Sequence, residues 1–302
     1  MVVVAALAEP ARAQRVDAPL AAPGQSQDRP AATAGDPIVV TGRPLPPKEE
    51  IRALARAITP PNPSDAPLPR FHDSVCFGSA GLDRPTLEAI GDRLAADAEQ
   101  AGLTLAGDGC KPNVITLFVD HVESEVAKLV QTKWWVFGDR SPGEIRSITR
   151  EKGPVRAWSN SETRSRDGDQ IDSGGFLKVA TASRVVASVR RDTLASIVLI
   201  ERAALLGKSP RQIGDYVAMR ALAGVRPQRV RDRETILTLF DSETTAVPAE
   251  LTAFDRGYLH GLYAGAANAF ASSTQGTIVR EILKAKGKEE APAARNGSAV
   301  HP

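Results

Sequence analysis

The sequence has few aromatic residues, few cysteines and almost no net charge. Aromatic side chains make up 5% of its 302 residues, which argues against extended platforms for stacking bases or sugars. Lysine and arginine number 38 against 36 aspartates and glutamates, so no overall field attracts nucleic acid or an anionic membrane. No apolar run approaches the roughly 20 residues that span a bilayer. We therefore expect no nucleic-acid partner and no transmembrane segment.

The common signatures of catalytic and metal sites are also missing. The chain has no G-x-S-x-G elbow, no phosphate-binding glycine-rich loop and no C-x-x-C pair. Its histidines are His72, His121, His260 and His301. None lies three or four residues from another, so no two of them form a ligand pair on one helix. We expect no cofactor and no bound metal, although histidines distant in sequence can still converge in a fold.

The first residues resemble the end of an export signal. Val2 to Ala8 form an apolar stretch, and Ala11-Arg12-Ala13 matches the small-residue pattern of a cleavage site before Gln14. A basic stretch normally precedes such a core, so we infer a true start codon upstream of the recorded one. The alternative is an ordinary alanine-rich terminus. The pattern predicts that residues 1–13 are a signal-peptide remnant and that the mature protein is periplasmic or secreted.

Proline and alanine dominate the next segment. Thirteen of the 22 prolines fall before residue 70, and such a composition buries too little apolar surface to offset chain entropy. Within it, Lys48 to Ile58 has the pattern of a short helix, with a flexible tether as the alternative. We expect a disordered Pro/Ala-rich segment over residues 14–69, a single globular domain over 70–285 and a disordered tail over 286–302.

The globular part alternates strand and helix patterns. Compact apolar segments predict strands over residues 73–77, 114–119, 155–159, 184–190 and 194–200. Amphipathic or capped segments predict helices over residues 85–101, 122–130, 141–150, 209–224, 252–264 and 277–284. The first strand, helix and second strand predict a parallel crossover. We therefore expect an α+β fold with a mixed twisted sheet, a long helix over 85–101 and a central buried helix over 209–224.

The segment over residues 209–224 has the clearest helix pattern. Ser209 and Gln212 match a capping box, and Gly224 can close the C-terminus. Few charged residues interrupt an otherwise apolar surface, which is why this helix is expected to be buried.

The two cysteines flank the first long helix. Cys76 ends the first predicted strand and Cys110 comes just before the second. If those strands are neighbours, the cysteines lie within bridging reach, and such a pair in an exported protein is usually a disulfide. Two thiols this far apart without a nearby histidine are a poor zinc signal. We expect a Cys76–Cys110 disulfide.

An aromatic cluster and two arginine-rich stretches are candidates for binding. Trp134 and Trp135 begin a Trp-Trp-Val-Phe segment, which is either the exposed lip of a groove or, more commonly, part of the core or a cap over the sheet. The arginines from Arg140 to Arg166 and from Arg226 to Arg233 fit an acidic polymer or, more commonly, solvated loops.

Three segments carry a likeness to a known family. They are Leu194 to Ala223, Ile236 to Phe240, and the segment from Leu251 to Tyr263, which begins Leu-Thr-Ala-Phe-Asp. In this order, within a match from about Arg70 to Glu281, they resemble the metzincin clan of zinc peptidases. They resemble uncharacterised exported alphaproteobacterial proteins on that plan more closely. In metzincins a Met-containing turn lies under the metal, and a closing helix often begins in a similar Leu-Thr-x-x-Asp manner.

The resemblance implies a zinc motif whose residues are lost. A metzincin helix carries H-E-x-x-H-x-x-G-x-x-H. In this register Arg211 replaces the first histidine, Gln212 the glutamate and Asp215 the second histidine, while Ala221 replaces the third histidine. A zinc-bound water then has no ligands to hold it, and the amide of Gln212 cannot act as a general base. The resemblance therefore implies a degenerate, non-catalytic relative, a pseudoenzyme.

Two functions remain open at this point. The first is a non-catalytic periplasmic binding or scaffolding protein that reuses a protease groove, with a periplasmic protein or peptide as partner. The second is a hydrolase with a non-standard active site, which a cluster of His72, His121 and His260 with a carboxylate would favour. Arg211 and Asp215 share one helix face, so we expect a buried Arg211–Asp215 ion pair in place of the zinc.

Overall fold

The computed structural model describes residues 47–62, 64–170, 185–227, 234–244 and 246–290. The chain divides into two units, Met1–Gly42 and Arg43–Pro302, and every described residue belongs to the second. The predicted signal-peptide remnant and His301 lie outside the described residues.

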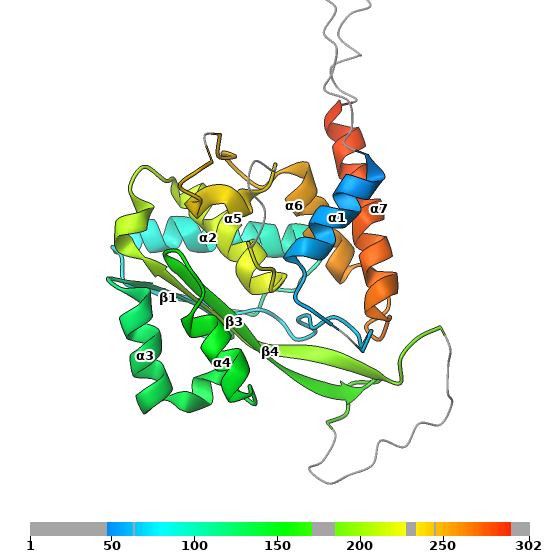
Figure 1. Cartoon of the computed structure of the whole chain (residues 1–302), viewed down its shortest axis with the longest axis horizontal. Coiled ribbons are helices and arrows are strands. Elements are labelled where there is room, and N and C mark those ends of the chain that lie inside the picture. Colours follow the sequence, from blue (N-terminus) through cyan, green and yellow to red (C-terminus); the bar gives the residue numbers. More distant parts are fainter. Residues whose placement is uncertain (1–46, 63, 171–184, 228–233, 245, 291–302) are drawn as a thin grey trace, which may run out of the picture. The chain divides into compact units, whose positions relative to one another are not determined.

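Within the described residues, a four-stranded mixed sheet has the strand order β1-β2-β4-β3 (Figure 1). β1 (Phe77–Ala80), β2 (Val114–Val119) and β4 (Val189–Glu201) are parallel, whereas β3 (Val155–Ser165) is antiparallel to β4. The predicted parallel pairing of the first two strands is confirmed. The prediction of separate strands over 184–190 and 194–200 is wrong, because one long strand runs from the end of the first range through the whole of the second. β3 is therefore an edge strand of the sheet.

Helices cover both faces of the sheet (Figure 1). On one face lie α1 (Lys48–Ile58), α2 (Arg84–Ala101), α5 (Pro210–Leu222), α6 (Ala253–Tyr263) and α7 (Ala271–Glu290). On the other lie α3 (Val122–Thr132), α4 (Pro142–Thr149) and the 3-10 turn η1 (Trp134–Phe137). Ile197 and Leu199 join the apolar cluster under α3 and α4, while Val198 and Ile200 join the larger cluster. Burial on both faces explains why this part of β4 is a continuous apolar run.

α5 occupies the centre of the larger cluster. Each residue from Ile213 to Leu222 is buried, and the capping box of Ser209 and Gln212 forms as predicted. Gly214 lies so close to α2 that an added Cβ would be 3.0 Å from Arg93 Cβ. The small residue at this position lets α5 pack closely against α2.

The folded unit is longer at both ends than predicted. α1 lies inside the segment expected to be disordered, yet Ile51, Ala55 and Ile58 are buried in the main cluster. Their i, i+4, i+7 spacing gives α1 one apolar face, which packs on α7. The short helix predicted over Lys48 to Ile58 is confirmed, but the proline-rich composition of the whole segment concealed its packing on the domain. α7 in turn continues to Glu290, past the boundary expected after residue 285.

Cys76 and Cys110 form the predicted disulfide, with their Cα atoms 6.1 Å apart. The backbone N–H of Cys76 also donates to Asn113 Oδ1, 2.8 Å away. Cys76 directly precedes β1 and Asn113 directly precedes β2, so this hydrogen bond is a second link between the starts of the two strands. In the part of the chain that the structure describes, no helix has the length and apolar character needed to cross a membrane.

Candidate functional site

The first turn of α5 lies at the surface. Arg211 is exposed and forms an ion pair with Glu250, with 2.8 Å between Nη1 and Oε2. Gln212 caps the helix by accepting from the N–H of Ser209, and its Nε2 donates to Pro248 O at 2.8 Å. The predicted buried pair between Arg211 and Asp215 is therefore wrong. The two residues share a helix face, but Arg211 lies at the surface and Asp215, one turn further along α5, lies in the core.

Asp215 is fully buried and bonded to other elements. Its carboxylate accepts a hydrogen bond from Arg93 Nε on α2 and another from the backbone N–H of Leu251, just before α6. The side chain therefore joins α2, α5 and the start of α6. Its carboxylate already has two donors inside the core, which leaves it poorly placed to hold a metal ion.

A second buried carboxyl lies beside this pair. Arg93 Nη2 is 3.2 Å from Asp97 Oδ1, one turn further along α2. Burial, followed by the negative charge of Asp215, raises the pKa of Asp97 to about 8 against the opposing effect of Arg93. Asp97 therefore holds a proton at neutral pH. Neither carboxyl is among the residues that line the cavity described below, so we assign both to the packing of α2 against α5.

The zinc implied by the metzincin resemblance does not fit the residues present. Arg211 is a cation paired with Glu250, Asp215 is bonded inside the core, and Ala221 has no donor atom. Within the described ranges, no group of three or more His, Cys, Asp or Glu residues is arranged to hold a metal. We derive no chemical step through a metal.

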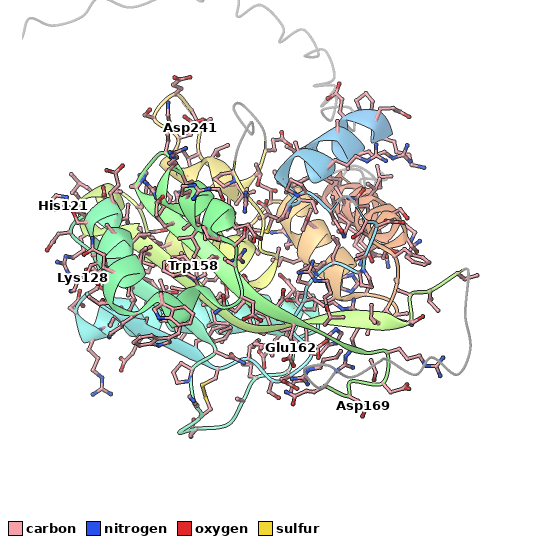
Figure 2. The ribbon with its side chains drawn as sticks, turned by 60° about the horizontal axis from the view of Figure 1, so that its bottom comes forward. His121, Lys128, Trp158, Glu162, Asp169 and Asp241 are labelled. Atoms are coloured by element: carbon pink, nitrogen blue, oxygen red, sulfur yellow. A yellow bond between two sulfur atoms is a disulfide. The ribbon has the colours of Figure 1, made fainter. Side chains whose placement is uncertain are left out.

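The histidines do not gather in one site. His72 Nε2 lies 3.6 Å from Asp192 Oδ1, and His260 Nδ1 lies 3.5 Å from Glu281 Oε2. His121 precedes α3, on the opposite face of the sheet (Figure 2). The arrangement that would favour a hydrolase with a non-standard site is therefore not formed by these three residues.

Asp192 is the centre of a buried ion-pair group on β4. Arg190 Nη2 is 2.9 Å from its carboxylate and Arg164 Nε is 3.5 Å away. Burial lowers the pKa of His72, while the neighbouring Asp192 opposes that effect. Asp192 thus joins the long β3–β4 hairpin to the segment before β1.

A cavity of about 570 Å³ lies at the C-terminal end of α5. Its walls include residues 59–62 after α1, residues 220–226 at the end of α5, and residues 157–161 of β3. Successive side chains of a strand point to opposite faces of the sheet. A cavity that touches five consecutive strand residues therefore runs along the free edge of β3. We call it the β3-edge cleft.

The backbone of β3 turns hydrogen-bonding groups towards this cleft. Ser159 lies opposite Ser196, whose N–H donates at 2.8 Å to the carbonyl just before β2. Ser161 lies opposite Thr193, whose N–H donates to Arg70 O at 2.9 Å. Because both β4 residues direct their N–H away from β3, their partners on β3 direct their own backbone groups outward. Among the described residues no strand pairs with this side of β3, although Arg140 donates to the Ser159 carbonyl.

Three arginines from distant segments meet at the cleft. Arg140 donates to Ser159 O at the edge of β3, and Arg191 Nη2 donates to Ser161 Oγ at 3.1 Å. Arg226 follows α5, and its N–H donates to Ile58 O at 2.8 Å. Burial lowers the pKa of Arg140, Glu144 opposes this, and the positive charges of Arg226 and Arg191 lower it further. Arg226 and Arg191 therefore lie close enough to Arg140 for their positive charges to act on it.

The other charges of the cleft are mostly compensated. Arg220 is buried and pairs with Glu151 at 2.9 Å, with Tyr216 Oη 3.0 Å away. Glu144 caps α4 by accepting from Ser141 N–H at 2.9 Å and lies 3.6 Å from Arg140 Nη1. Asp139 is the other acidic residue among the described lining residues.

The aromatic cluster is divided between surface and interior. Phe137 and Trp158 stack with their ring centroids 4.8 Å apart, and both line the cleft. Figure 2 shows Trp158 inside the fold, where its Nε1 donates to Val136 O. Trp134 and Trp135 are 66% and 59% exposed and are not among the lining residues. The interpretation as a cap therefore fits Phe137 and is wrong for the two tryptophans.

The sequence matches no family model, and comparisons with curated proteins and with solved structures find no match.

Sequence reasoning missed the cleft. Arg140 and Arg226 lie in the stretches interpreted more commonly as solvated loops, and Arg191 lies within a strand. One sequence signal was present, because the apolar residues of this strand end at Trp158 and only polar residues follow from Ser159 to Ser165.

Proposed function

We propose that the protein is an exported, non-catalytic binding module that holds an extended peptide against the free edge of β3. An added strand gains main-chain hydrogen bonds from such an edge, a recurrent mode of peptide recognition. The β3-edge cleft offers this edge together with polar side chains and a volume suited to a few residues.

The observation that carries this proposal is the contrast between the two ends of α5. At the N-terminal end, Asp215 is bonded to Arg93 and Leu251 inside the core. At the C-terminal end lies the cleft, where the backbone groups of Ser159 and Ser161 point away from β4 and Arg140 contacts the Ser159 carbonyl. Peptide binding needs only the cleft at the C-terminal end of α5, whereas zinc catalysis would need metal ligands at its N-terminal end.

The order of the elements around α5 supports a degenerate metzincin-like origin. β4 leads into central α5, and the 3-10 turn η3 (Ile236–Phe240) packs against α5 before α6 begins. Asp255 on α6 holds η3 in place by accepting from Ile236 N–H at 2.8 Å and from Thr235 Oγ1. This chain departs from the family at η3, which contains no methionine.

Export is supported by the disulfide and the apolar first residues. A Cys76–Cys110 bridge persists in an oxidising compartment such as the periplasm. The partner we propose is accordingly a periplasmic protein segment or peptide.

Hydrogen exchange with a defined peptide pool tests the proposal. The protein is incubated with random acetylated, amidated pentapeptides, and exchange is followed residue by residue. We expect slower exchange at Ser159 and Ser161, with no change at Ser196, whose N–H is already bonded within the sheet. Mass analysis of the pool should show no new peptide termini. Cleaved peptides, or protection elsewhere only, would overturn the proposal.

A further inference from the structure

We propose that the β3-edge cleft selects extended peptides that carry a carboxylate, which binds to the guanidinium groups of Arg140, Arg191 and Arg226. This inference rests on the proposed function and adds the chemistry of the ligand. The three arginines come from separate segments of the chain, so their meeting is a property of the fold alone.

The contacts of the arginines place positive charge beside the strand edge. Arg140 contacts the Ser159 carbonyl and Arg191 contacts the Ser161 hydroxyl, so two guanidinium groups flank successive outward positions of β3. A peptide that pairs with this edge would bring a side chain or its terminus next to them. A guanidinium group binds a carboxylate through two parallel hydrogen bonds, which a lysine ammonium cannot reproduce.

Among the described residues that line the cleft, four are arginines and two, Asp139 and Glu144, are acidic, so positive charge is left for a ligand. Arg220 is compensated by Glu151, and Glu144 is shared between the α4 cap and Arg140. Arg140 Nε is buried and has no hydrogen-bond partner within the described residues. Arg226 and Arg191 place positive charge next to the guanidinium group of Arg140, and a bound carboxylate would relieve this repulsion. Charge complementarity therefore favours an acidic occupant over a neutral one.

The carboxylate has two possible sources, which are an Asp or Glu side chain and the C-terminus of the peptide. Two immobilised-protein selections separate them. One uses random acetylated pentapeptides with an amidated C-terminus, and the other uses the same pool with a free carboxylate. The retained peptides are sequenced and compared with the input pool.

We expect enrichment of Asp or Glu at one position of the amidated pool if a side chain supplies the carboxylate. Stronger retention of the free-acid pool without such enrichment would assign it to the terminus. The variants Arg140→Gln, Arg191→Gln and Arg226→Gln should each reduce the enrichment about tenfold, the effect of losing about 1.4 kcal/mol of charge-assisted bonding. Arg211→Gln is the matched control, because Arg211 lies on the far end of α5, and it should retain full enrichment.

The remaining outcomes are also decisive. Retention of peptides without any preference for a carboxylate would overturn this inference and leave the proposed function intact. Retention of no peptide would overturn both. An acidic preference unchanged in all three cleft variants would place the acid-binding site elsewhere and refute the assignment. Thermal unfolding of each variant confirms that it is folded, and Arg226→Gln tests the cluster without touching the contacts of β3.

Discussion

The guanidinium group of Arg93 on α2 donates to the buried carboxylate of Asp215 on α5, across 122 residues of sequence. The same carboxylate receives the N–H of Leu251, so one side chain joins three segments of the core. In the metzincin resemblance this position would hold a histidine ligand. Under the metzincin-like origin that we propose, a metal-ligand position has become a helix-packing contact.

Asp215→Ala should lower the free energy of unfolding by about 3 kcal/mol, because it leaves Arg93 and the Leu251 N–H without their buried partner. Arg211→Ala on the same helix is the control and should cost less than about 1 kcal/mol, since its pair with Glu250 is exposed. Denaturant unfolding measures both variants. Equal effects would contradict the assignment of Asp215 as the packing contact.

The raised pKa of Asp97 predicts a pH dependence of stability. The folded protein holds this proton up to a pKa of about 8, whereas the unfolded chain releases it near pH 4. The folded state therefore binds more protons in this window, and its stability falls as pH rises from about 4 to about 8. Asp97→Asn should flatten this part of the profile. An unchanged slope in the variant would show that Asp97 is not the group responsible.

Loss of the disulfide should lower stability without removing the fold. The bridge spans 34 residues, a loop that corresponds to roughly 3–4 kcal/mol in the chain-entropy treatment. The double variant Cys76→Ser, Cys110→Ser is compared with the oxidised protein by denaturant unfolding. The two proteins would unfold at the same denaturant concentration if the bridge contributed nothing.

Close packing of α6 on α7 depends on glycine at position 261. A Cβ added at Gly261 would overlap the backbone of Ile278, whereas one at Gly276 on α7 would meet nothing within 4 Å. We expect Gly261→Ala to lower the free energy of unfolding by about 1–3 kcal/mol. Gly276→Ala should be neutral or stabilising by up to about 1 kcal/mol, because alanine favours a helix. A harmless Gly261→Ala would mean that the two helices can separate at little cost.

Local signals in the sequence predict much of the fold. The capping box at Ser209 forms as its spacing indicates. The predicted Cys76–Cys110 bridge follows from a strand–helix–strand pattern, since parallel neighbours bring the ends of their strands together. These features depend on residues close in sequence or on one simple crossover.

Contacts between distant segments could not be predicted in the same way. Arg93 lies on a helix whose charged residues all look solvent-exposed in sequence, so its role as the partner of Asp215 was hidden. The cleft likewise needs Arg140, Arg191 and Arg226 to meet, and each comes from a different element. Such meetings are decided by the packing of the whole domain.

Native mass spectrometry tests the central claim most directly, because it counts zinc ions and peptides on each chain at once. The protein is measured with equimolar zinc, with the amidated pentapeptide pool, and with both together. We predict complexes of one peptide per chain that form equally well with and without zinc and are about tenfold weaker in Arg140→Gln. One zinc ion held tightly by each chain, or peptide binding that requires zinc, would contradict the account.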